Sequence, residues 1–194
     1  MKVAGLLLAA GAGRRFGMAK ALALFHGRPL VRHGADTLAA GGCDPVLVVV
    51  GAQAAAVRAA AAGLSLVDNP DWATGMGSSL RAGLTVLADG PADAVVVLLA
   101  DMPGVSGAAV ARMVAVAGPD ALAAGGYGDR RGHPVLLGRA HWAGVAATAT
   151  GDRGARDYLR ERAVRVVEVG DVADDTDADT PHLLSLVESA VPRA

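Results

Sequence analysis

The segment from Leu8 to Lys20 follows an apolar run and contains three glycines, two adjacent arginines and a lysine. Glycines let the backbone approach a ligand closely and point several N–H groups at one anion, while Arg15 and Lys20 add full charges. Lys20 is one of only two lysines in a chain whose other basic residues are arginines. The segment therefore predicts a phosphate-binding loop, whose expected contact residues are Leu8, Ala9, Ala10, Gly11, Gly13, Arg14, Arg15 and Lys20.

Other kinds of glycine-rich loop fit this segment less well. A Walker A loop needs glycine directly before its lysine and a hydroxyl after it, whereas Lys20 lies between two alanines. A dinucleotide fingerprint would be GxGxxG, and the spacing here is GxGxxxG. It should also be followed by an acid after the second strand, but residues 51–53 are Gly, Ala and Gln. A glycine-rich turn with solvated arginines remains an alternative.

Carboxylates in two segments could hold a divalent cation. Asp101 follows an aliphatic strand of the kind expected at the centre of a sheet, where open α/β folds bind their ligands. Magnesium takes one or two carboxylates together with phosphate oxygens and water, so a second acid is expected. Residues 174–181 offer four, namely Asp174, Asp175, Asp177 and Asp179. For any single acid of this segment the alternative is a solvated turn in which Asp179 or Thr180 caps the last helix.

The segment from residue 69 to residue 84 is expected to contain a flexible turn followed by the start of a helix. Ser78 and Ser79 are predicted to cap that helix, which would run to about residue 88. The turn could hold the ribose and base of a nucleotide, or it could be only a well-capped helix start. The residues expected to contact a nucleotide here are Asn69, Gly75, Ser78, Ser79 and Arg81.

Two further segments are candidates for binding a second anion. Residues 130–134 read as a polar loop between strands, from which His133 could touch an acceptor phosphate. Residues 151–156 form a loop entering a helix, and Asp152 and Arg156 are its predicted acceptor contacts. A lone histidine in a loop can equally be structural or simply exposed.

The elements that must position these residues alternate between strand-length apolar runs and alanine-rich helical stretches. This pattern predicts an α/β fold with a mostly parallel sheet and helices on both faces. The expected strands are 3–9, 45–50, 64–67, 94–100, 121–124, 134–137 and 164–169. The expected helices are 30–38, 53–62, 78–88, 108–116, one from about 139, one from about 155, and 181–190.

Composition narrows the function classes. The formal net charge of −1 gives no global field that would attract nucleic acid or an anionic membrane. Two each of Trp, Tyr and Phe are too few for a surface that stacks the bases of nucleic acid. Cys43 is the only cysteine, which excludes an internal disulfide and fits a reducing compartment. No apolar run approaches the ~20 residues of a membrane span. We expect one cytoplasmic domain over residues 1–194, with the apolar N-terminus as a strand rather than a signal peptide.

Six motifs in this order resemble the molybdopterin nucleotidyltransferase family, and within it the molybdenum cofactor cytidylyltransferases. They span nearly the whole chain, and each is weak alone. The motifs are LAAGxGxRxG with a following lysine (8–20), NPDWxxGMxSSLRAGL (69–84), ADMP (100–103), RGHPV (131–135), GDRGAR (151–156) and DADTP (177–181).

The resemblance implies a Rossmann-like, single-domain nucleotidyltransferase fold. It implies transfer of CMP from CTP to molybdopterin with release of pyrophosphate, and Mg²⁺ as cofactor with Mn²⁺ as a substitute. Arg15, Lys20 and Asp101 would be the catalytic residues, and Asp101, Asp177 and Asp179 the metal ligands. A molybdenum hydroxylase apoenzyme is the candidate protein partner.

Departures from the family pattern affect the expected nucleotide base and the match to the last motif, DADTP. Guanylyltransferase relatives typically open with LAGG, so Ala10 favours cytosine. Gly77 stands where relatives often have serine, and His182 where many have glutamate. The alternatives are a guanylyltransferase, a sugar-phosphate or phospholactate nucleotidyltransferase, a non-catalytic module that inserts a cofactor into a partner oxidoreductase, and an NAD-dependent oxidoreductase.

Overall fold

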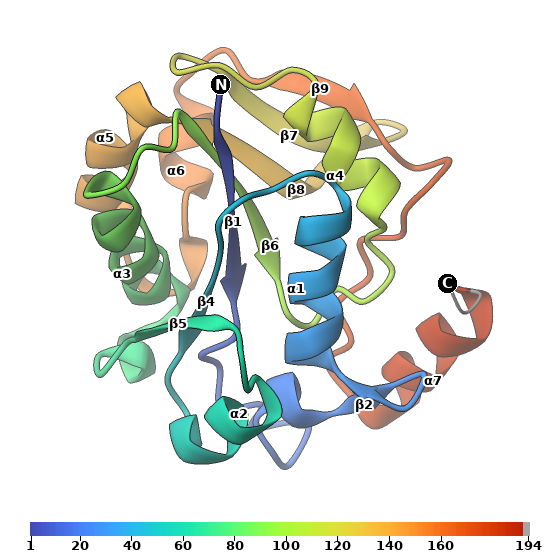
Figure 1. Cartoon of the computed structure of the whole chain (residues 1–194). Coiled ribbons are helices and arrows are strands. Elements are labelled where there is room, and N and C mark those ends of the chain that lie inside the picture. Colours follow the sequence, from blue (N-terminus) through green and yellow to red (C-terminus); the bar gives the residue numbers. More distant parts are fainter. Residues whose placement is uncertain (192–194) are drawn as a thin grey trace.

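The structure is a computed structural model of the whole chain, and it describes residues 1–191. A seven-stranded sheet in the order β5-β4-β1-β6-β8-β7-β9 forms its centre (Figure 1). The strands are β1 (Val3–Leu8), β4 (Val46–Val50), β5 (Ser65–Asp68), β6 (Ala94–Leu99), β7 (Leu122–Tyr127), β8 (Arg130–Gly138) and β9 (Arg165–Glu168). Only β8 runs antiparallel to its neighbours, so the predicted mostly parallel sheet is confirmed.

Helices cover both faces of this sheet, as the alternating pattern predicts (Figure 1). One face packs α1 (Leu30–Ala40), α2 (Ala54–Ala60) and α4 (Gly107–Val114), and the other packs α3 (Met76–Ala88), α5 (Trp142–Thr148) and α6 (Arg156–Arg160). Every side chain of β1 is buried, because this strand lies between β4 and β6 with helices above and below. Burial on both faces explains why β1 and β6 are uniformly aliphatic rather than alternating.

A smaller layer lies outside the sheet. A short hairpin of β2 (Leu24–Phe25) and β3 (Arg28–Pro29), which sequence patterns did not predict, packs against α7 (Pro181–Ala190). The buried residues of this small core are Ala23, Phe25, Leu30, Ala178, Leu184 and Val187. Residues 1–191 also contain four short 3-10 helices, η1 (Lys20–Leu22), η2 (Trp72–Thr74), η3 (Arg139–His141) and η4 (Gly151–Arg153).

Two local predictions were wrong. Helix α3 begins at Met76, and Ser78 and Ser79 lie buried inside its first turn instead of capping it. Residues 130–134 belong to β8 rather than to a loop. Pro134 is tolerated inside the sheet because the register of β7 and β8 shifts between Ala124 and Gly125, beside it, and such irregularities are where strands accept proline.

Candidate active site

The predicted phosphate loop lies at the carboxyl end of β1. Gly13 turns it: its φ is +59°, and its carbonyl accepts hydrogen bonds from the amides of Phe16 (2.8 Å) and Gly17 (2.9 Å). A Cβ at position 13 would lie 1.9 Å from the carbonyl oxygen of Met18, so only glycine fits here. The turn brings Lys20, at the start of η1, back towards the end of the sheet.

Lys20 lies between two carboxylates from distant parts of the chain. Its Nζ donates to Asp101 Oδ2 at 2.7 Å and also to Asp179 Oδ1. Asp101 follows β6, the central strand of the sheet, and Asp179 directly precedes the Thr180 cap of α7. Asp179 is also paired with Arg15 at 2.8 Å. The fold thus gathers Arg15, Lys20, Asp101 and Asp179 at one place.

The charges in this cluster shift one another's pKa values. Burial acts to lower the pKa of Lys20, but Asp101 and Asp179 outweigh it and raise that pKa. The hydrogen bond from Lys20 lowers the pKa of Asp179. Burial, followed by the nearby charges of Asp101 and Asp179, raises the pKa of Asp177. Lys20 and Asp179 are therefore charged at neutral pH, and three carboxylates share one region.

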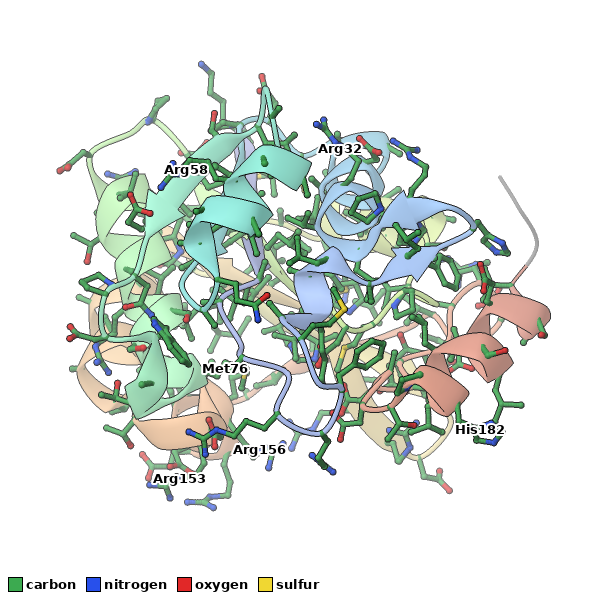
Figure 2. All side chains as sticks on the ribbon, turned by 90° about the horizontal axis from the view of Figure 1, so that it is seen from below. Arg32, Arg58, Met76, Arg153, Arg156 and His182 are labelled. Atoms are coloured by element: carbon green, nitrogen blue, oxygen red, sulfur yellow. The ribbon has the colours of Figure 1, made fainter. Side chains whose placement is uncertain are left out.

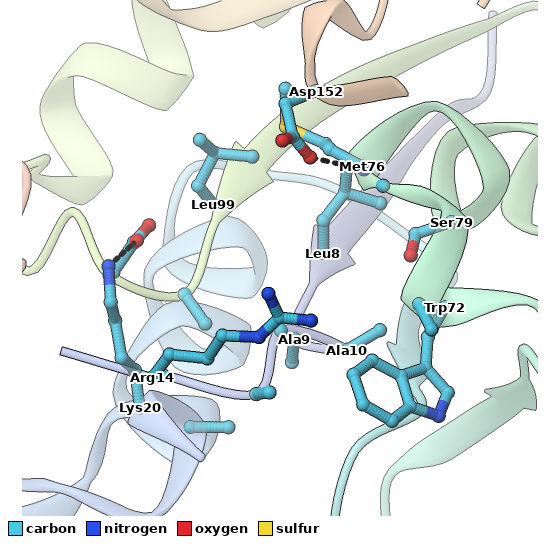
Figure 3. A pocket seen from close by; sticks show the side chains of 18 of the residues that line it. Leu8, Ala9, Ala10, Arg14, Lys20, Trp72, Met76, Ser79, Leu99 and Asp152 are labelled. Carbon is cyan, nitrogen blue, oxygen red and sulfur yellow. Dashed lines mark hydrogen bonds and ion pairs between the residues drawn. The ribbon is translucent and has the colours of Figure 1, made fainter. Parts of the chain in front are cut away.

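A cavity of about 480 Å³ lies in front of this cluster (Figure 3). Figure 3 shows Lys20 at one side, Trp72 at the other and the side chain of Arg14 reaching between them. Its lining includes three cations and three carboxylates, namely Arg14, Arg15, Lys20, Asp101, Asp152 and Asp179. The uncharged lining residues include Leu8, Ala9, Ala10, Gly11, Gly13, Trp72, Gly75, Met76 and Ser79.

The start of α3 forms the opposite wall of this cavity. Gly75 has a φ of +111°, and a Cβ there would collide with the backbone of Gly151 at 2.4 Å. Asp152 Oδ1 accepts a hydrogen bond from the amide of Met76 at 3.3 Å, so a residue 76 positions away partners the first turn of the helix. Asp152, predicted to contact an acceptor, thus lines the first cavity.

Three residues predicted to contact a nucleotide do not line the cavity: Asn69, Ser78 and Arg81. Asn69 is buried and its Nδ2 donates to Ser78 Oγ (2.8 Å) and Ser79 Oγ (2.9 Å), which fixes the first turn of α3 against the end of β5. The guanidinium of Arg81 donates to the carbonyl of Ala149. These side chains hold the wall in place.

Replacing Asn69 by alanine is expected to lower the free energy of unfolding by about 1–3 kcal/mol, because two buried hydroxyls lose their amide partner. Urea unfolding monitored by circular dichroism measures it. Thr148→Ala, which removes an exposed hydroxyl bonded within its own helix, is the control and should change that free energy by less than about 0.5 kcal/mol. Equal effects of both variants would contradict this role for Asn69.

A second cavity of about 430 Å³ adjoins the first along Leu8, Met76 and Leu99, which line both. Its wall is aliphatic, with Leu80, Val97, Val135 and Leu137 among the lining residues. Its charged groups are Arg131, Arg153, Arg156 and Arg160. Figure 2 shows Arg153 and Arg156 on one side of the molecule, well apart from His182 on α7. Sequence motifs predicted contacts from His133 and Arg156 here. They did not predict contacts from Arg131, on the same strand as His133, or from Arg160, on the same helix as Arg156.

His133 lines this second cavity from β8. Burial lowers its pKa to about 4, against the opposing effect of Asp101 and Asp175. The imidazole is therefore neutral at pH 7, and contributes a hydrogen-bonding group instead of a positive charge. The charge that would attract an anion into this cavity comes from the arginines.

The described residues lack a ready-made metal site and a membrane-spanning helix. Within residues 1–191, no three His, Cys, Asp or Glu side chains are gathered closely enough to hold a metal ion by themselves. No helix there has the length and apolar character that crossing a bilayer requires.

Comparisons with known proteins agree with this architecture. The sequence model of the MobA-like NTP transferase domain matches residues 5–166. A nucleotidyl transferase from Methanothermobacter has the same fold, with a TM-score of 0.85, 19% identity and 97% of each chain covered. A Mycobacterium tuberculosis protein solved in complex with manganese has a TM-score of 0.79 and 27% identity, over 98% of this chain and all of that one.

A relative with a different printed activity is also similar. The nicotine blue oxidoreductase of Paenarthrobacter nicotinovorans is 39% identical over 188 residues, which are 92% of each protein. The domain match covers most of the chain, from β1 into β9, and includes the phosphate loop and Asp101. This chain therefore belongs to the MobA-like NTP transferase family of nucleotidyltransferases.

Proposed function

We propose that the chain transfers CMP from CTP to molybdopterin and releases pyrophosphate. The observation that carries this proposal is the meeting of Arg15, Lys20 and Asp101 at the phosphate loop, beside a cavity large enough for a nucleotide. The relatives establish the family but not the substrates, so CTP and molybdopterin rest on the motifs and on the chemistry of the two cavities.

The triphosphate is proposed to lie along the loop amides. Residues 11–15 and Lys20 line the first cavity at one side, and Trp72 and Ser79 line it where the base and ribose would lie. Ala10 adjoins Trp72: a Cβ on Gly51 would lie 2.9 Å from Ala10 Cβ and 2.5 Å from Trp72 Cβ. This small, fixed corner supports Ala10 as a determinant of the base.

A divalent cation fits the carboxylates of this cavity. The lining carries three carboxylates and three cations, so its own positive charge is offset. The carboxylates would repel a polyphosphate unless a bound cation neutralised them. Asp101 and Asp179 both contact Lys20 Nζ, so a cation bound by both would take the place of that ammonium, and the charges of both act on Asp177. Asp101 with Asp179 or Asp177 would hold magnesium or manganese, which supplies charge neutralisation at the reacting phosphate oxygens.

The second cavity is proposed to hold the acceptor. Its aliphatic wall suits a ring system, and its arginines suit an anionic group such as the phosphate of molybdopterin. Because the two cavities share Leu8, Met76 and Leu99, an acceptor phosphate there can face the α-phosphorus of a nucleotide in the first. Arg15 and Lys20 would neutralise charge gathering on the leaving pyrophosphate.

Pyrophosphate release from CTP and from GTP, each with and without molybdopterin, tests this proposal. We expect release from CTP, with magnesium and only when molybdopterin is present. Release from GTP in preference would indicate a guanylyltransferase. Release from CTP with a sugar phosphate or phospholactate, but not with molybdopterin, would identify another acceptor. Nucleotide binding without release under any condition would favour a non-catalytic insertion module.

The name of the 39% identical relative favours a second candidate, a redox reaction of an organic compound held in the second cavity. A nicotinamide dinucleotide would then have to use the glycine-rich loop. Against it, β4 is followed by Gly51, Ala52 and Gln53, which offer no carboxylate for a ribose hydroxyl. Quenching or enhancement of NADH fluorescence on adding the protein would support this candidate, and its absence would count against it.

A further inference from the structure

The side chain of Asp179 forms ion pairs with Arg15 and Lys20, the two cations that we expect to bind a triphosphate. Its Oδ2 lies 2.8 Å from Arg15 Nη2, and its Oδ1 accepts from Lys20 Nζ, which also donates to Asp101 Oδ2 at 2.7 Å. Both cations line the first cavity, as Asp179 does. A nucleotide that binds Arg15 and Lys20 must therefore compete with this carboxylate.

The backbone around Asp179 is held on both sides, so the residue cannot simply move away. The amide of Ala178 donates to the carbonyl of Asp101 at 2.8 Å, and the Ala178 side chain is fully buried in the core under α7. Thr180 on the other side caps α7 through the amide of Leu183 at 3.2 Å. These backbone contacts keep Asp179 in the lining of the cavity.

A displaced carboxylate in that position needs another positive partner. Beside a metal-free triphosphate it would face a second polyanion, which like-charge repulsion makes unfavourable. Beside a nucleotide that carries a divalent cation, the same carboxylate gains a ligand position on that cation. The metal-free nucleotide would therefore repel the Asp179 carboxylate once it has lost Arg15 and Lys20, whereas the metal-bound nucleotide would provide it with a new positive partner.

We propose that Asp179 is a specificity-determining residue that makes triphosphate binding depend on a divalent cation, by holding Arg15 and Lys20 in an ion-paired state until its carboxylate is taken up by the incoming metal-bound nucleotide. This inference rests on the proposed function, because it assumes that the loop binds a triphosphate. It goes beyond a metal-ligand role, since it predicts an effect of Asp179 when no metal is present.

The test is calorimetric titration of the purified full chain with inorganic tripolyphosphate, with EDTA or with magnesium. The probe has no base, so it reports only on the phosphate subsite. We expect the wild-type chain to bind it much more tightly with magnesium. Asp179→Asn should bind it about tenfold more tightly than wild type in EDTA, the equivalent of one hydrogen bond to a charged group, and should gain less from magnesium.

Matched variants separate this effect from a general change of charge or shape. Asp171→Asn removes the same charge from the same tail, where Asp171 pairs with exposed Arg112, and should behave as wild type. Asp179→Ser removes the charge with a smaller side chain and should behave as Asp179→Asn. Asp179→Glu keeps the charge and should keep the weak metal-free binding. Thermal melts establish that each variant is folded.

The outcomes distinguish this inference from the proposed function. Folded Asp179→Asn and Asp179→Ser variants with unchanged or weaker metal-free affinity would overturn the inference and leave the proposed function standing. A wild-type chain that binds tripolyphosphate neither with magnesium nor without it would overturn both.

Discussion

Lys20→Ala and Asp101→Ala are each expected to lower the rate of pyrophosphate release by about two orders of magnitude or more. Lys20 Nζ and Asp101 Oδ2 lie 2.7 Å apart at the end of the phosphate loop, so each is placed to act on the same group of phosphate oxygens. Removing one preorganised charge from such a site typically raises the barrier by ~3 kcal/mol. Coupled-enzyme measurement of pyrophosphate checks the prediction.

The control for this experiment is Arg58→Ala, which removes a cation that pairs with Asp68 on the surface and touches neither cavity. Its rate should equal that of wild type. Circular dichroism should show native secondary structure for all three variants. Near-normal product formation by either Lys20→Ala or Asp101→Ala would refute the assignment of that residue to catalysis.

The second large effect is expected from Gly13→Ala. The new Cβ would lie 1.9 Å from the carbonyl oxygen of Met18, and alanine at φ +59° costs about 1–2 kcal/mol before this clash is counted. The loop must then change shape, and its amides no longer converge on one anion. We expect the affinity for CTP with magnesium to fall by at least about tenfold.

Isothermal titration calorimetry with CTP and magnesium measures this loss. Gly118→Ala is the matched control, because a Cβ there would meet only Ala121 Cβ at 3.8 Å, an ordinary contact. It should bind CTP as wild type does. If Gly13→Ala retained wild-type affinity, the loop conformation described here would not be the one that binds the nucleotide.

The sheet and the position of the glycine-rich loop were predictable because their signals are local. An aliphatic run such as 94–99 can only be a buried element, and glycines with cations after such a run indicate an anion site. The placement of Asp101 at a strand end follows from the same pattern. The extent of the single domain, 1–194, and the binding role of each site residue stay predictions.

What the sequence could not show depends on contacts between distant residues. The Lys20–Asp179 pair joins positions 159 residues apart, and the choice of Asp179 over its neighbours as the partner of Lys20 depends on how α7 packs on the β2–β3 hairpin. Ser78 was predicted to cap α3. Instead Asp152, which lies in η4, accepts a hydrogen bond from the Met76 amide at the start of that helix. The four arginines that line the second cavity likewise come from β8, η4 and α6.

The measurement that tests the central claim most directly is a crystal structure of the chain with CTP and magnesium. We predict the triphosphate along the amides of residues 11–15, with Lys20 at the phosphates, the cation on Asp101, and the base beside Trp72. A structure in which CTP binds elsewhere, or in which Lys20 and Asp101 stay paired and contact neither phosphate nor cation, would contradict the account.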